Sequence, residues 1–314
     1  MSRVKNSCWF ITLSVIIGMI GCKPQKSKEG TYDTSSHGTI NISVDESFKP
    51  VIEAQIAMYH NSYPETKIVA HYKPEAECIK DLFNDSATRT VIITRGLTEK
   101  EAKYFTAELG YIPANNIVAT DAIAIVVNNA SEDTLFTLER LKQQLAGKVN
   151  TQQHIVFDGL SATSTLRFIM DSVLKGQALD TTVVKAAKSS KDVLEYVAND
   201  KNAIGLVGIS WIGNPEVPEQ VAMLKKVKLA YVQCTVCDSL PYVKPMQESI
   251  LTRRYPLVRG LYYVNKEGYA GLGTGFVNFL KNERGQLIFR RAYLGPIMPL
   301  GIRNLRLNEK LPKK

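Results

Sequence analysis

Segments with the apolar pattern of a strand alternate with segments that have the pattern of a helix along most of this sequence. Short apolar runs, alternating with polar residues at 39–44 and nearly continuous at 117–127, predict strands at residues 39–44, 67–72, 90–94, 117–127, 154–157, 203–207 and 257–264. Apolar positions three or four residues apart predict helices after Pro50 and at 75–85, 138–145, 164–174, 192–198, 275–280 and 283–293. Thr98 and Glu101 have the spacing of a capping box and mark the start of another helix. Strands that alternate with helices predict an α/β fold with a parallel-rich sheet covered on both faces.

Three of the predicted strand-to-helix junctions are rich in hydroxyl groups. In such sheets ligands bind at the carboxyl ends of strands, and the first amides of a helix attract anions. Serine and threonine hydroxyls would add donors there, and arginine would add bidentate, charge-assisted bonds. The candidate ligand residues are Asp45, Glu46, Ser47, Phe48, Thr94, Arg95, Ser161, Thr163, Ser164, Thr165 and Arg167. Helix capping by the hydroxyls, and solvated surface charge for both arginines, are the alternative roles.

A carboxylate in the first junction would give an anion site selectivity. Phosphate carries a proton near neutral pH, and sulfate does not. Asp45 or Glu46 could accept that proton, whereas sulfate would leave the buried acceptor without a partner, at a cost of about 1–3 kcal/mol. These residues therefore favour a protonated oxyanion as the ligand.

The first residues have the layout of an export signal. Arg3 and Lys5 precede an apolar run, residues 9–20, which is too short to span a bilayer and leads to Gly21 and Cys22. This ending resembles a bacterial lipobox, so we expect removal of residues 1–21 and lipid attachment at the Cys22 sulfur. An ordinary signal peptide with a chance cysteine and an uncleaved anchor are the alternatives. Residues 22–37 are polar and predict a flexible tether.

The charge, the cysteines and the histidines argue against several other classes of function. The net charge of +9 is spread along the chain, which argues against nucleic acid as a partner and favours a diffuse attraction for anions. Cys234 and Cys237 lack a second ligand pair for zinc, so they form either a loop disulfide or two free thiols. All four histidines precede Ser161, which excludes the order of residues in a nucleophile-elbow hydrolase. We expect no enzyme activity, no metal and no cofactor.

Four segments resemble the periplasmic phosphate-binding protein family of ABC transporters. Residues 120–128 (TDAIAIVVN) are similar to the family's crossing strand, and residues 203–210 (AIGLVGIS) to its Ala-Ile-Gly-Tyr-Val-Gly strand. Residues 255–262 (YPLVRGLY) and 276–293 resemble its return strand and its C-terminal helices. The third loop keeps Asp158-Gly159 of the family's Arg-x-Asp-Gly-Ser-Gly-Thr signature. It has no arginine near Val156, a charge that Arg95 or Arg167 could supply.

The resemblance implies a two-lobe, type II solute-binding fold with a hinge, each lobe a mixed, mostly parallel sheet flanked by helices. It places lobe I at residues 38–118 and 250–314 and lobe II at 119–249. The implied function is capture of inorganic phosphate between the lobes on the periplasmic side of the bacterial membrane, for delivery to an ABC transporter permease. The alternative hypothesis is the same fold used as a sensor, an adhesin or a binder of another oxyanion such as sulfate.

Overall fold

The computed structural model describes residues 32–149 and 151–298. The chain divides into two units after Tyr32, and all elements given below belong to the second unit, which begins at Asp33. The predicted signal sequence, residues 1–21, and the predicted lipid site at Cys22 lie outside the described residues. No helix in the described part of the chain is long and apolar enough to cross a membrane.

A ten-stranded mixed sheet forms the framework of this unit. Eight strands follow the order β2-β1-β3-β12-β4-β8-β6-β7, and β13 and β9 pair with β4 beside this path. The strands are β1 (Gly38–Asp45), β2 (Thr66–Lys73), β3 (Thr88–Ile93), β4 (Ala114–Asn128), β6 (His154–Phe157), β7 (Val184–Ala186), β8 (Ala203–Gly208), β9 (Val227–Leu229), β12 (Val258–Asn265) and β13 (Gly295–Pro296). β1 pairs in parallel with β2 and β3, and β6 with β7 and β8, whereas each antiparallel pair of this sheet involves β4 or β12.

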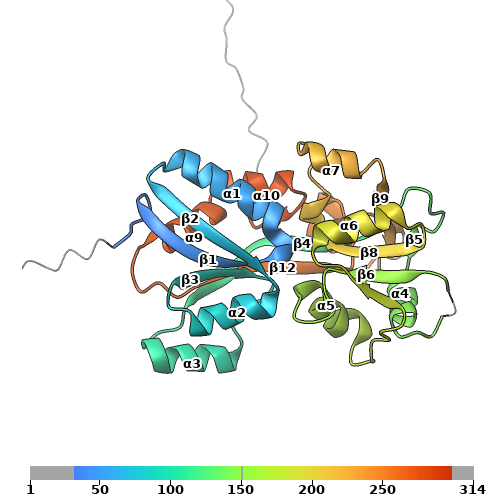
Figure 1. Ribbon diagram of the computed structural model, residues 1–314, viewed down its shortest axis with the longest axis horizontal. Helices are drawn as coiled ribbons and strands as arrows, with labels where there is room; N and C mark the ends of the chain where they lie inside the picture. The colour runs from blue at the N-terminus through green and yellow to red at the C-terminus, as the bar shows by residue number, and fades with distance from the viewer. Residues whose placement is uncertain (1–31, 150, 299–314) are drawn as a thin grey trace, which may run out of the picture. The chain divides into compact units, whose positions relative to one another are not determined.

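Strand β4 belongs to both halves of this sheet (Figure 1). The first half contains β2, β1, β3 and β12, and the second half contains β8, β6 and β7. The first part of β4, as far as Ala122, pairs with β12, and from Ile123 onward it pairs with β8. Residues 122–127 are buried on both faces, which agrees with the long apolar run in the sequence. The two-lobe α/β fold with a mixed sheet is therefore confirmed, and β4 and β12 connect its halves.

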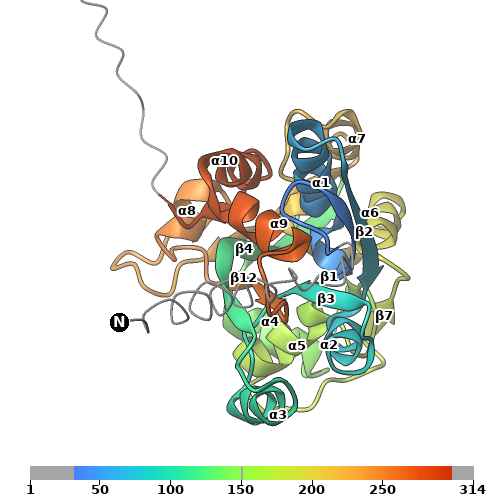
Figure 2. The ribbon, with the colours of Figure 1, turned by 90° about the vertical axis from the view of Figure 1, so that its left-hand side faces the viewer.

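Helices cover both faces of each half. They are α1 (Lys49–Ser62), α2 (Glu75–Asn84), α3 (Glu99–Leu109), α4 (Leu138–Leu145), α5 (Ser164–Ile169), α6 (Ser190–Asn199), α7 (Pro218–Met223), α8 (Gln247–Leu251), α9 (Leu272–Lys281) and α10 (Glu283–Arg291). Short 3-10 turns, η2 (Glu46–Phe48) and η4 (Ile209–Trp211), follow β1 and β8. In the first half α1 and α9 lie on one face of the sheet and α2 and α3 on the other, as Figures 1 and 2 both show. In the second half α6 and α5 cover opposite faces of β6 and β8 (Figure 1).

Local sequence signals account for several helix ends. Thr98 and Glu101 form the predicted capping box of α3, and Gly110 ends that helix at a φ of 78°. The helix predicted at residues 164–174 is α5 continued by a π-helical turn, η3 (Met170–Leu174). One large apolar core extends through both halves, and a smaller one lies beneath α2 and α3 around Leu82 and Phe105.

Two features of the structure, the residues before β1 and the cysteine pair, go beyond what the sequence predicts. The tether predicted for residues 22–37 extends too far, because Asp33 is already bound to the folded unit. Its carboxylate pairs with Arg89 at 2.7 Å and accepts hydrogen bonds from Tyr269 and the Leu272 amide. Cys234 and Cys237 form a disulfide, which decides between the two alternatives left open. It lies beside a small sheet that was not predicted, made of β5 (Leu135–Phe136), β10 (Tyr231–Gln233) and β11 (Tyr242–Val243).

Candidate functional site

The first predicted loop, between β1 and α1, enters the interior of the molecule. Asp45 ends β1 and accepts a hydrogen bond from the Ser47 amide at 3.0 Å, which holds the turn. The Ser47 side chain is fully buried, and its hydroxyl lies 3.3 Å from that of Ser164 and 3.5 Å from an Asp158 oxygen. This loop therefore meets the third predicted loop through side chains 111 and 117 residues apart.

Glu46 takes a different direction from its neighbours. Its carboxylate accepts hydrogen bonds from the amide and hydroxyl of Ser190, at 3.2 Å and 2.7 Å, at the start of α6. Burial raises the pKa of Glu46 to about 7, although the bonds from Ser190 oppose the shift. Glu46 thus connects the first loop to the second half of the molecule.

The third predicted loop, between β6 and α5, is anchored by its hydroxyls. Thr163 caps α5 by accepting from the Leu166 amide at 3.3 Å, so the alternative role of capping applies to this residue. Ser164 and Thr165 are fully buried, and the Thr165 hydroxyl donates to Asp158 at 3.3 Å. Ser161 is exposed at the outer end of the loop. Of these four residues, Thr163, Ser164 and Thr165 are buried, and Ser161 is not.

Arg259, which was not among the predicted ligand residues, lies between the two loops. It pairs directly with Asp121 across β12 and β4, and its Nε donates to an Asp121 oxygen at 2.8 Å. Its Nη1 donates to the Ser164 hydroxyl at 2.9 Å, and its guanidinium lies 5.1 Å from the centre of the buried Phe48 ring. Gly208 leaves room for the first loop beside this group, since a Cβ there would lie 3.1 Å from the Ser47 carbonyl oxygen. Arg259 thus supplies the positive charge that the third loop lacks.

A signal for Arg259 was present in the sequence. Arg259 and Asp121 are charged residues inside otherwise apolar strands, and such residues are rarely buried without a partner. In the sequence, both positions belong to segments that resemble the family's crossing and return strands. Nothing local indicated that the two would pair with each other.

The buried polar cluster, which we define as Asp45, Ser47, Asp121, Asp158, Ser164, Thr165 and Arg259, has unused bonding capacity. Within the described residues, Asp45 Oδ2, Asp121 Oδ1, Asp158 Oδ1 and Arg259 Nη2 are buried and have no hydrogen-bond partner. Such groups are costly unless something satisfies them. Burial raises the pKa of Asp45 to about 6, against the opposing charge of Arg259, and burial also raises the pKa values of Asp121 and Asp158. The cluster can therefore both donate hydrogen bonds to a ligand and accept them from it.

The remaining predicted residues lie beside this cluster or away from it. Arg95 makes a bidentate ion pair with Glu101, with both N–O distances at 2.7 Å, at the start of α3. None of the interactions in the described part of the chain joins Arg95 to the buried polar cluster. Thr94 and Arg167 both bind Glu75, a residue that was not predicted, and Arg167 Nη2 donates to the Thr94 hydroxyl at 2.6 Å.

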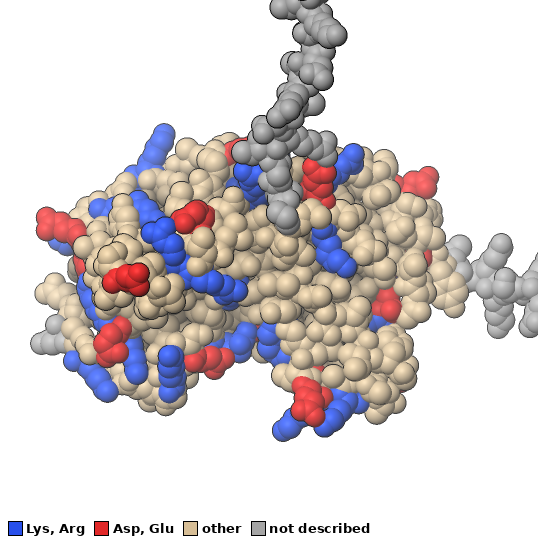
Figure 3. Space-filling model, turned by 180° about the vertical axis from the view of Figure 1, so that it is seen from behind, with Lys and Arg blue, Asp and Glu red and all other residues tan. Residues whose placement is uncertain are grey.

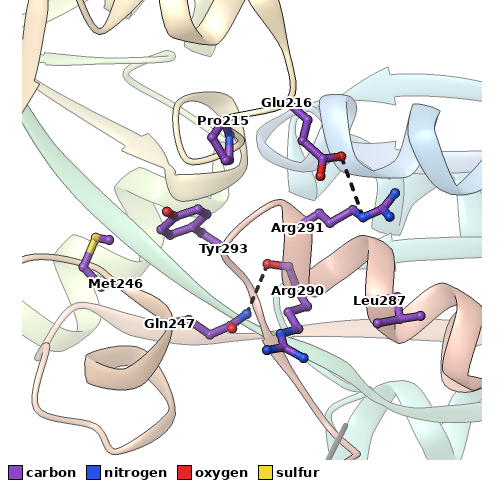
Figure 4. A pocket seen from close by; sticks show the side chains of 8 residues that line it. All are labelled: Pro215, Glu216, Met246, Gln247, Leu287, Arg290, Arg291 and Tyr293. Carbon is purple, nitrogen blue, oxygen red and sulfur yellow. Dashed lines mark hydrogen bonds and ion pairs between the residues drawn. The ribbon is translucent and has the colours of Figure 1, made fainter. Parts of the chain in front are cut away.

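Open cavities lie elsewhere. One of about 510 Å³ is lined by Pro215, Glu216, Met246, Gln247, Leu287, Arg290, Arg291 and Tyr293 (Figure 4). Another, of about 860 Å³, lies along β2 and α1. Neither shares a residue with the buried polar cluster, so neither forms part of this site. No group of metal-binding side chains occurs within residues 32–149 and 151–298.

The surface charge is dispersed. On the face shown in Figure 3, lysine and arginine side chains are mixed with aspartate and glutamate instead of forming a stripe. A continuous basic stripe is the usual footprint of a nucleic-acid interface. On this face the distribution agrees with the prediction of a diffuse field.

Comparisons with known proteins identify the family and the fold of this chain. A family model described as PBP superfamily domain matches residues 29–284. A Clostridium perfringens protein, provisionally named a phosphate ABC transporter substrate-binding protein and solved with bound phosphate, has a similar structure. The TM-score is 0.67 and the identity 20%, over 83% of this chain and 100% of that one.

Two further solved structures have the same fold. An ABC-type phosphate transport receptor from Vibrio cholerae matches with a TM-score of 0.59 and 20% identity, over 83% of this chain and 100% of that one. PstS from Borrelia burgdorferi matches with a TM-score of 0.52 and 19% identity, over 84% and 100%. Among curated proteins there is no match. The resemblance seen in the sequence is thus confirmed, and at these identities the solved structures establish the fold.

Proposed function

The chain belongs to the family described as PBP superfamily domain, and on this premise we propose that it captures phosphate between its lobes for an ABC transporter. The proposed lobes are residues 38–118 with 250–314, and 119–249. The change of partner along β4, from β12 to β8 after Ala122, supports a boundary in this region. Opening about the crossing strands would admit the anion, and closure would remove its water.

The observation that carries the proposal is the buried polar cluster. Arg259 Nη2 and the Ser164 hydroxyl can donate to phosphate oxygens. The hydroxyls of Ser47 and Thr165 can do the same when they turn away from Asp158, and Asp45 and Asp158 can accept from P–OH groups. A monoprotonated or diprotonated phosphate satisfies both kinds of partner. Sulfate has no proton at neutral pH and would face several carboxylates with one guanidinium, so it should be rejected.

The ligand set proposed here keeps part of the predicted set and extends it. Asp45, Ser47, Ser164 and Thr165 remain proposed ligands, and Asp158 and Arg259 join them. Phe48, Thr163 and Glu46 hold the loops in place through packing, capping and the Ser190 bonds. The bonds of Arg95 to Glu101 and the exposure of Ser161 give these two residues no place in the set.

Export, lipid attachment at Cys22 and a permease partner complete the proposal. The signal-like layout of residues 1–22 supports the first two, and the Cys234–Cys237 disulfide is typical of an oxidising compartment. A lipid anchor would keep the protein close to a membrane permease. Membership of a family of binding proteins supports a transport role over an enzymatic one.

Calorimetry on the full chain, purified in detergent and freed of anions, tests this function. We expect heat on titration with phosphate and none with sulfate. Ser164→Ala should weaken phosphate binding at least about tenfold, because it removes a hydroxyl at the centre of the cluster. The matched control is Ser62→Ala, whose hydroxyl binds the Met58 carbonyl on α1 and should not matter. Absence of heat and of any thermal shift with phosphate would refute the proposal, and binding of sulfate alone would support the oxyanion alternative.

A further inference from the structure

Glu75 occupies a set of donors that would suit a small oxyanion. It begins α2, and its side chain is only 3% exposed. One carboxylate oxygen accepts from the Thr94 amide at 2.8 Å, from the Thr94 hydroxyl and from Arg167 Nη2 at 3.3 Å. The other accepts from Arg167 Nε at 2.6 Å. A main-chain amide, a hydroxyl and a guanidinium are the groups that bind phosphate and sulfate in proteins.

This ion pair also connects the two halves of the molecule. Glu75 and Thr94 come from the half that contains β1 and β3, whereas Arg167 is on α5 in the other half. The next residue, Ala76, donates its amide to the Ala162 carbonyl at 3.1 Å. The ion pair is thus made where the halves meet, beside the third loop.

Glu75 lies close to the buried polar cluster. Its charge is one of the influences that raise the pKa of Asp45, after burial and against Arg259. The buried polar cluster and the Glu75–Arg167 ion pair together contain two guanidinium groups and four carboxylates, those of Asp45, Glu75, Asp121 and Asp158. Because Arg167 is committed to Glu75, one arginine remains for a ligand.

We propose that Glu75 determines the anion specificity of the site by withholding Arg167 and Thr94 from the ligand. The inference rests on the proposed function and adds the residue that sets its selectivity. With Glu75 in place, an anion meets one arginine and several carboxylate acceptors, so only a protonated oxyanion is well bound. Without the Glu75 charge, Arg167 is free to neutralise an anion that carries no proton.

Titration of full-length variants with phosphate and with sulfate tests this inference. Glu75→Gln should gain sulfate affinity at least about tenfold over the wild-type chain, while its phosphate affinity changes by less than that. Glu77→Gln is the matched control, because Glu77 is exposed on the same helix and should leave both affinities unchanged. A purely structural ion pair would instead weaken both anions together and leave their ratio unaltered.

A double variant keeps the inference testable if Glu75→Gln fails to fold. Glu75→Gln with Arg167→Gln removes both charges of the pair and leaves none buried alone. It should retain phosphate binding within about threefold and still reject sulfate, because Arg167 is not a ligand in the wild-type chain. A loss of phosphate binding beyond about tenfold in this variant would overturn the inference.

The outcomes separate the two proposals. A wild-type chain that binds neither anion refutes the proposed function and the inference with it. A wild-type chain that binds phosphate alone, together with a folded Glu75→Gln variant that still refuses sulfate, refutes the inference and leaves the function standing. A gain in sulfate affinity of at least about tenfold in Glu75→Gln, with Glu77→Gln unchanged and phosphate bound by the wild-type chain, supports both.

Discussion

Replacement of Arg259 by methionine is the most informative perturbation of this fold. The Arg259 guanidinium and the Asp121 carboxylate are almost fully buried and lie 2.8 Å apart. Methionine preserves much of the packing volume but removes the charge. It therefore leaves Asp121 buried without its partner, and it leaves Asp45 and Asp158 without the positive charge that lowers their pKa values. We therefore expect Arg259 to stabilise the folded chain even in the absence of a ligand.

The expected cost follows from the burial of the pair. Removal of one partner from a buried ion pair destabilises proteins by about 3–5 kcal/mol. For a unit of this size that loss corresponds to a fall in Tm of about 5–9 °C. The loss should depend on pH. Without Arg259 the pKa values of the folded carboxylates rise further, so the variant binds protons more readily when folded and loses stability as pH increases.

Urea unfolding of the wild-type chain and Arg259→Met at pH 5 and pH 8 measures both effects. We expect the larger difference in the free energy of unfolding at pH 8. The double variant Asp121→Asn with Arg259→Met should recover at least half of the loss, because it leaves no charge unpaired across the two strands. A cost below about 1 kcal/mol at both pH values would show that the pair does not hold β4 and β12 together.

Three further predictions concern separate features. Because burial raises the folded pKa of Asp45 from 3.8 to about 6, its contribution to stability is lost as pH rises through that range. Asp45→Asn should thus stabilise the ligand-free chain by up to about 3 kcal/mol at pH 8 and have little effect at pH 4, and equal melting shifts at both would contradict this. Gly205→Ala places a Cβ 2.8–2.9 Å from Val193 and Val197, so calorimetric melting should show a loss of about 1–3 kcal/mol, whereas an unchanged Tm would mean that α6 can move. Cys237→Ser opens a disulfide between residues only three apart, so urea unfolding should reveal a loss of about 2 kcal/mol, and a much larger one would point to lost packing.

The order of strands and helices could be predicted because each element has its own local pattern. The crossing strand was recognised from an apolar run and is β4, and the capping box at Thr98 predicted the start of α3. Short elements without a clear period were missed, among them β10 and β11, whose two or three residues pair mainly through tertiary contacts. The end of the tether was misplaced because Asp33 is polar, and only its partner Arg89 shows that it is bound.

In the candidate site, too, some features follow from neighbouring residues and others depend on contacts between distant segments. Neighbouring residues were enough to predict which loops carry hydroxyls and that a carboxylate ends the first strand. They could not show which arginine serves the cluster, because Arg95 pairs with Glu101 six residues away and Arg259 with Asp121 at a separation of 138 residues. The partner of a buried charge depends on strand register and on the packing of distant segments. No local pattern of hydrophobic and polar residues encodes that choice.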